Sequence, residues 1–193
     1  MVGQIGPLVQ VGRRRTALAL HVLGGATGGA LIGIVLGFGG LLLRAALGDT
    51  LDNVFAFAVP AALVYAALVD LGLLPVAPVT AERQTPGSWP CSLGHYPGIF
   101  GWGFDLGLGI TTRIPYQSLL VLPLAALLSG SLPEAVAITT VYGASRALAV
   151  VAAISAGGDD FPAACNAIQT RVMSLKALVG VAALALAVMI VIF

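Results

Sequence analysis

IFGWGFDLGLGITTRIPYQSLLVLPLAALLSG, residues 99–130, is apolar over most of its length yet contains Asp105, Arg113 and Pro115. As one helix it would be about 45 Å long, whereas the hydrocarbon core of a bilayer is about 30 Å thick. Because Pro115 lacks a backbone N–H, a helix through residues 110–116 is expected to kink or open there. The stretch predicts a broken membrane helix; the alternative is a kinked structural helix whose arginine pairs with a neighbour.

Polar side chains surround the expected break: Thr111, Thr112, Arg113, Gln117 and Ser118. Backbone groups freed at membrane depth are tolerated where they are buried in protein or line a wet cavity. A broken helix with a buried arginine is therefore a candidate functional site.

The composition places the whole chain in a membrane. Of its 193 residues, 59 % are hydrophobic and 9 % are charged, whereas a soluble domain carries about 25 % charged residues. Long apolar stretches without β alternation predict an all-α helical bundle. The net charge is +1 and the basic residues are scattered along the chain, so binding of nucleic acid is not expected. Cys91, Cys165, His21 and His95 are too few and too dispersed to predict a metal site, and no cofactor is expected.

The chain is expected to form one transmembrane domain over residues 1–193, with about five spans. Arg13, Arg14 and Arg15 precede the first span, so residues 1–15 are expected on the cytoplasmic side of the inner membrane, with no cleavage of that span. Residues 75–98 contain five prolines and three glycines, which predicts an irregular cytoplasmic connection. The five spans are expected at residues 16–47, 53–74, 99–130, 135–156 and 171–193. The last loop is expected at residues 157–170.

Glycines recur at a four-residue interval in the first span, at Gly25, Gly29, Gly33 and Gly37. This GxxxG spacing places small residues on one helix face and predicts close packing against another backbone. The span is over-long, like residues 99–130, and is likewise expected to be broken. Two such interrupted helices in corresponding positions indicate a binding site between them.

Counting along the helices places His21, Asp105 and Arg146 about 8–12 Å from the cytoplasmic boundary. We expect a buried charge cluster in which Asp105 pairs with Arg146, with His21 and Tyr65 nearby.

The same count places Arg113 about 20 Å deep, near Thr139 and Thr140 and without an acidic residue at its level. Arg113 is therefore expected either to bind an anion or to donate to carbonyls freed by the break.

Residues 112–157, TRIPYQSLLVLPLAALLSGSLPEAVAITTVYGASRALAVVAAISAG, resemble the second half of the CcdA/DsbD transmembrane thiol-electron carriers. The similar features are Ile114-Pro115-Tyr116, the small-residue turn at residues 129–131, and the Tyr-Gly-x-x-Arg-x-Leu pattern at residues 142–148. Together with the wider grouping of that family with LysE-type exporters, the resemblance implies a cavity between two broken helices. The family exchanges electrons through membrane-embedded cysteines. Tyr116 stands where a cysteine would, so the redox mechanism is not carried over.

These features predict an integral membrane transporter that moves a small solute, anionic if Arg113 binds it. Its expected site consists of Thr111, Thr112, Arg113, Pro115, Tyr116, Gln117, Thr139, Thr140 and Tyr142. One alternative is a non-catalytic scaffold or accessory subunit that binds a membrane-protein partner or a second copy. Another is a redox accessory protein that uses Cys91 and Cys165 in its cytoplasmic loops. An enzyme is not expected, because no metalloprotease, nucleophile-elbow or nucleotide-binding motif is present.

Overall fold

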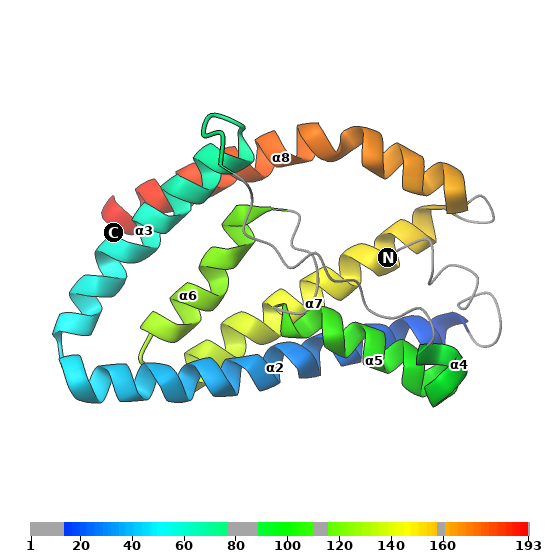
Figure 1. The fold of residues 1–193 in the computed structure, drawn as a ribbon, viewed down its shortest axis with the longest axis horizontal. Coiled ribbons are helices and arrows are strands. Elements are labelled where there is room, and N and C mark those ends of the chain that lie inside the picture. Colours follow the sequence, from blue (N-terminus) through cyan, green and yellow to red (C-terminus); the bar gives the residue numbers. More distant parts are fainter. Residues whose placement is uncertain (1–13, 77–88, 110–115, 158–160, 193) are drawn as a thin grey trace. The chain divides into compact units, whose positions relative to one another are not determined.

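The protein is helical throughout the part described by the computed structural model, which covers residues 14–76, 89–109, 116–157 and 161–192 (Figure 1). This confirms the all-α class. The elements are α2 (Arg14–Leu47), α3 (Thr50–Asp70), α4 (Trp89–Leu93), α5 (His95–Leu108), the 3₁₀-helix η1 (Gln117–Leu120), α6 (Val121–Leu128), α7 (Leu132–Gly157) and α8 (Phe161–Ile192).

Three helices in the described residues are long and apolar enough to cross a membrane: Arg14–Leu47, Thr50–Asp70 and Leu132–Ala152. Shorter apolar helices cover Gln117–Leu128 and Leu175–Ile190. Large apolar side chains lie on the surface of all three candidate spans, among them Leu42, Phe57 and Val141. Such a surface suits lipid rather than water. The membrane class is thereby supported, and the full number of five spans stays a prediction.

The first apolar segment forms one continuous helix. α2 is 34 residues long, so its predicted excess length is confirmed and its predicted break is wrong. Glycine keeps the backbone N–H that proline lacks, so it does not interrupt the helical hydrogen bonds. Several glycines of α2, among them Gly24, Gly25, Gly28 and Gly29, instead lie against other helices.

The 99–130 stretch is divided between two helices. α5 ends at Leu108, and Gly109 follows in the left-handed conformation at φ 73°, as is common after a helix C-terminus. Tyr116 is extended and precedes η1. Residues 110–115 lie outside the described part, so the opening at Pro115 stays a prediction.

Two predicted connections are partly helical. Residues 75–98 contain α4 and the start of α5, and residues 157–170 contain the start of α8. Pro90, Pro97 and Pro162 each lie in the first turn of one of these helices. The first-turn N–H groups have no partner within the helix, so proline is tolerated there.

The chain forms two compact units. Unit 1 consists of residues 1–32, 81–113 and 139–171, and unit 2 of residues 33–80, 114–138 and 172–193. Each is described below by itself. The expectation of a single transmembrane domain stays a prediction.

In unit 1, the N-terminal part of α2 packs between α5 and α7. Gly24 lies against Phe100 and Gly28 against Phe104 and Leu108, so α2 and α5 run parallel (Figure 1). Gly25 lies against Gly143 and Ala147, and Gly29 against Thr139, so α2 and α7 run antiparallel. The predicted close packing of the glycine face is confirmed.

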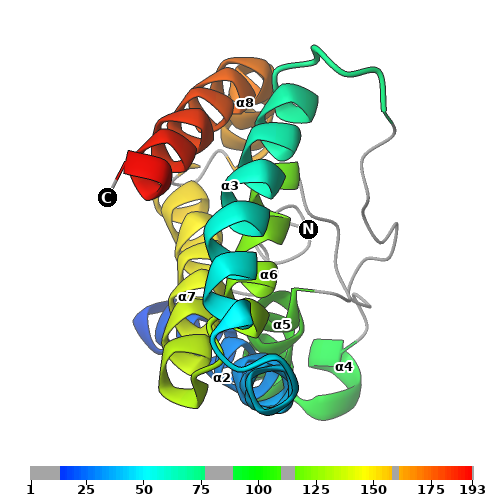
Figure 2. The ribbon, with the colours of Figure 1, turned by 90° about the vertical axis from the view of Figure 1, so that its left-hand side faces the viewer.

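Unit 2 has an apolar core between α3, α6 and α8, and Figure 2 shows α6 beside α3. Its buried members are Leu51, Val59, Leu63, Ala66, Ala67, Val121, Leu128, Ala183 and Ala187. The spacing of the α3 members places them on one helix face, which fixes that helix against its neighbours.

Candidate functional site

A buried carboxylate in unit 2 binds the start of a short helix. Asp70, the last residue of α3, is 7 % exposed. Its Oδ1 accepts a hydrogen bond from the Gln117 backbone N–H at 2.8 Å. Its Oδ2 accepts two from Ser118, one from the backbone N–H at 3.0 Å and one from the hydroxyl at 2.7 Å. Asp70 thus caps η1 from a different helix, in a position that favours a negative charge.

The capped helix is too short to cross a bilayer alone. η1 contributes four residues and α6 eight, which together extend about 20 Å against a hydrocarbon core of about 30 Å. Gln117 and Ser118, at its start, are both buried. Unit 2 therefore contains a short apolar helix, about two thirds of the length of a membrane span, whose first N–H groups are satisfied by an ionisable side chain.

The residues predicted to form the solute site fall into three groups. Thr111, Thr112, Arg113 and Pro115 lie outside the described residues. Tyr116 and Gln117 belong to unit 2, where Gln117 donates to Asp70 and Tyr116 precedes it in an extended conformation. Thr139, Thr140 and Tyr142 belong to unit 1. The structure thus groups Tyr116 and Gln117 with a carboxylate that was not among the predicted site residues.

The three predicted site residues of unit 1 are buried or half-buried between helices. Thr139 is fully buried, and its carbonyl oxygen faces Gly29. Tyr142 is 2 % exposed, and its ring lies over Gly109. Thr140 is half-buried. The side chains of Thr139 and Tyr142 therefore contribute to helix packing in the described structure.

Three glycines meet where α2, α5 and α7 approach one another. A Cβ atom on either Gly107 or Gly143 would collide with the carbonyl oxygen of Gly25. A Cβ on Gly103, one turn before Gly107, would collide with the carbonyl oxygen of His21. The three backbones are close enough that any side chain at this crossing would separate the helices.

Arg146 is anchored beside this crossing. Its Nη1 donates to the Leu106 carbonyl oxygen at 3.0 Å and to the Tyr142 hydroxyl at 3.3 Å. Its guanidinium carbon lies 5.5 Å from the centre of the Tyr142 ring, within cation–π range. Arg146 therefore contacts the α5 residue that follows Asp105. The predicted pairing of Asp105 with Arg146 stays a prediction.

His21 contacts a different level of α5. It is 2 % exposed, and its Nδ1 lies 3.4 Å from the Ile99 carbonyl oxygen. Ile99 and Leu106 are two turns apart, so the contacts of His21 and Arg146 on α5 are separated by about 10 Å. Tyr65, expected nearby, is half-exposed on α3 and belongs to unit 2.

Asp70 is not among the site residues predicted from the sequence. The available signal was a lone acidic residue ending an apolar helix, together with Gln117 and Ser118 at the start of another apolar run. Acidic side chains stabilise helix N-termini, but nothing in the sequence joins positions that are 48 residues apart.

The described residues contain no group of three or more histidine, cysteine or acidic side chains placed to hold a metal ion. The side chains of Cys91 and Cys165 lie outside those described. Comparison of the chain with protein-family models, with curated proteins and with solved structures finds no match.

Proposed function

We propose that this chain is an integral membrane transporter that moves a small solute past the start of the short apolar helix Gln117–Leu128. The observation that carries the proposal is the buried Asp70 carboxylate at the first N–H groups of that helix. Ionisable side chains buried in membrane helices are costly and are retained mainly at functional sites. Short, interrupted helices are the usual components of transporter binding sites.

The proposed site consists of Asp70, Tyr116, Gln117 and Ser118 of unit 2. A solute that replaced the Asp70 carboxylate at the helix start would be an anion. Arg113, which precedes Tyr116 in the sequence and lies outside the described residues, stays the residue proposed from the sequence to bind the anion. Asp70 would then release its three hydrogen bonds as the solute binds. The resemblance to CcdA/DsbD carriers and LysE-type exporters supports a carrier with an interrupted helix at residues 99–130. Their thiol chemistry is not carried over, because Tyr116 stands where a cysteine would.

The finer topology is also part of the proposal. Five spans in the inner membrane, with a cytoplasmic N-terminus, place Arg13, Arg14 and Arg15 on the cytoplasmic side. The lipid bilayer and a small solute are the expected partners. Cysteine labelling of Ser92→Cys and Asp49→Cys in intact cells, each in a chain that also carries Cys91→Ser and Cys165→Ser, tests this arrangement, because the two positions are expected on opposite sides of the membrane.

The function is tested by reconstituting the full chain in proteoliposomes and measuring efflux of radiolabelled acetate and phosphate. We expect efflux of at least one anion above that of empty liposomes, with loss on Arg113→Ala and on Asp70→Asn. Asp52→Asn is the matched control, since Asp52 is an exposed carboxylate on the same helix. Transport that survives Arg113→Ala unchanged would exclude the anion site, and loss on Asp52→Asn as well would indicate general damage.

A second function, a non-catalytic membrane scaffold, is favoured by the glycine crossing of unit 1. There Gly25, Gly107 and Gly143 bring three backbones together, and such packing stabilises a rigid support. A scaffold would co-purify in fixed stoichiometry with a membrane-protein partner or with a second copy, and would show no efflux in liposomes. Efflux from the chain alone would contradict this alternative.

A further inference from the structure

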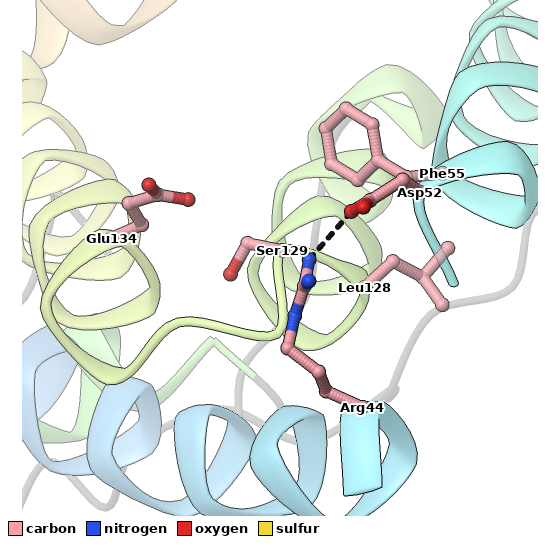
Figure 3. A pocket seen from close by; sticks show the side chains of 6 residues that line it. All are labelled: Arg44, Asp52, Phe55, Leu128, Ser129 and Glu134. Atoms are coloured by element: carbon pink, nitrogen blue, oxygen red, sulfur yellow. Dashed lines mark hydrogen bonds and ion pairs between the residues drawn. The ribbon is translucent and has the colours of Figure 1, made fainter. Parts of the chain in front are cut away.

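A polar pocket of about 290 Å³ lies at one end of unit 2, where α2, α3, α6 and α7 meet. Figure 3 shows Arg44 extending from α2 to Asp52 on α3, with Glu134 on the other side of the pocket and Ser129 between them. Arg44 Nη2 donates to Asp52 Oδ1 at 2.5 Å. The remaining lining residues are Phe55 and Leu128.

The negative charges in this pocket outnumber the positive ones. It contains one guanidinium, from Arg44, and two carboxylates, from Asp52 and Glu134. Arg44 and Asp52 form an ion pair, so their charges offset each other and the pocket keeps a net negative charge from Glu134. The pocket therefore complements a ligand with a single positive charge.

An apolar groove of about 310 Å³ begins at the same aromatic side chain. Phe55 lines both the polar pocket and this groove, which continues along Val59 and Leu63 of α3. Leu122 and Ala125 of α6 and Ala182 and Leu186 of α8 form much of the opposing walls.

The pocket and the groove lie along one face of α3. Asp52, Phe55, Val59 and Leu63 are separated by three or four residues, so their side chains share a helix face. The groove follows this face for about 12 Å from Phe55 to Leu63. Its far end reaches Ser118, whose hydroxyl is bound to Asp70.

We propose that the polar pocket and the apolar groove form one binding site for an amphiphile with a positively charged headgroup and a single apolar tail. The headgroup lies near Glu134 and against Phe55, whose ring attracts a cation through its negative face. The tail lies in the groove between α3, α6 and α8. This inference is independent of the proposed transport function, because it concerns equilibrium binding.

The test measures binding of dodecyltrimethylammonium to the full chain in phosphatidylcholine nanodiscs, with empty nanodiscs as the control for partition into lipid. Tridecanoate and dodecyl maltoside have the same length of tail with an anionic and a neutral headgroup. Tetramethylammonium has the headgroup without the tail. We expect saturable binding of dodecyltrimethylammonium that is tighter than binding of the other three. Equal binding of the three tailed amphiphiles would overturn the proposal.

Two variants test the two parts of the site. Glu134→Gln removes the excess charge, and we expect it to weaken dodecyltrimethylammonium binding about three- to fivefold, as for a partly exposed ion pair. Asp49→Asn removes the same charge outside the pocket, at the N-cap of α3, and should leave binding unchanged. Equal losses from the two variants would mean that only the general negative field attracts the cation, which would overturn the headgroup site.

For the groove, Ala182→Leu fills space next to the tail, while Ala185→Leu adds the same side chain to an exposed position of α8 outside the groove. Each methylene group excluded from an apolar site costs about fourfold in affinity. We expect Ala182→Leu to weaken dodecyltrimethylammonium binding at least about tenfold and Ala185→Leu to leave it unchanged. Unchanged binding by a folded Ala182→Leu variant, verified by its melting temperature, would overturn the assignment of the tail to this groove.

Discussion

Asp70 and Ser118 are joined by two hydrogen bonds that meet at one carboxylate oxygen, Asp70 Oδ2. One bond comes from the backbone and one from the hydroxyl of Ser118, and a third bond from the Gln117 N–H reaches Oδ1. The end of α3 is thereby attached to the start of η1 through a charged side chain that is almost fully buried.

Replacing this carboxylate with an amide should destabilise unit 2. In Asp70→Asn one oxygen becomes an NH₂ group, which faces the N–H groups of η1 and cannot accept their hydrogen bonds. Buried hydrogen bonds to a charged group contribute about 1.5–3 kcal/mol, and we expect a loss of about 3 kcal/mol in the free energy of unfolding in detergent micelles. Ser118→Ala should cost about 1 kcal/mol, because the backbone N–H remains bonded. A loss from Ser118→Ala as large as that from Asp70→Asn would contradict this account.

The glycine crossing should not tolerate a methyl group. In Gly25→Ala the added Cβ would lie 2.7 Å from both the Ala147 Cβ and the Gly143 carbonyl oxygen. We expect overpacking to lower the unfolding free energy by about 1–3 kcal/mol. In Gly39→Ala, on the same helix, the nearest atom is the Cδ1 of Leu127 at 3.0 Å, at the end of a flexible side chain.

Gly39→Ala should therefore be neutral or stabilise α2 by about 0.5 kcal/mol, since alanine favours the helix over glycine. The apparent melting temperatures of the two variants, measured under one detergent condition, give the comparison. Equal effects would indicate that helix propensity, rather than contact between helices, decides both.

The predicted pairing of Asp105 with Arg146 can be measured by a double-mutant cycle. Arg146 of α7 donates a hydrogen bond to the Leu106 carbonyl oxygen of α5. Asp105 directly precedes Leu106 in the sequence. We expect Asp105→Asn and Arg146→Met to be coupled by about 1 kcal/mol in unfolding free energy. Additivity within about 0.3 kcal/mol would show that Arg146 is held by Leu106 and Tyr142 without Asp105.

The ion pair of Arg44 with Asp52 should contribute little to stability. The two side chains are 39 % and 62 % exposed, so water and salt screen their attraction. We expect Asp52→Asn to lower the unfolding free energy by less than about 1 kcal/mol. The difference in unfolding free energy between the original chain and Asp52→Asn should vanish near 1 M salt, where the Debye length is about 3 Å. A larger, salt-independent loss would show that Asp52 has a structural role beyond this pair.

The features that the sequence predicts correctly are those with a local pattern. Apolar length indicates the membrane helices, and the four-residue spacing of Gly25 and Gly29 indicates a face for close backbone contact, which the structure confirms. The errors concern residues whose local pattern fits two structures. Pro90, Pro97 and Pro162 are typical of loops and equally of first helical turns, and here they begin helices.

The candidate site could be predicted only in part. Gln117 was singled out because it is polar within an apolar run, but its bonding partner depends on how α3 packs against η1. The carboxylate of Asp70 reaches Gln117 across 47 positions of the chain, and no periodicity connects them. Thr139 and Tyr142 are predicted as solute ligands because they are polar, and this stays a prediction. Their burial and their contacts with Gly29 and Gly109 depend on how the helices pack, which the sequence does not show.

The glycine crossing also limits how α2 can slide within unit 1. A shift by four residues, about 6 Å, would place Ile32 where Gly28 meets the Phe104 carbonyl oxygen. The same shift in the other direction would place His21 where Gly25 meets the Gly143 carbonyl oxygen. Neither side chain fits against a backbone at such a distance, so the register of α2 against α5 and α7 is fixed.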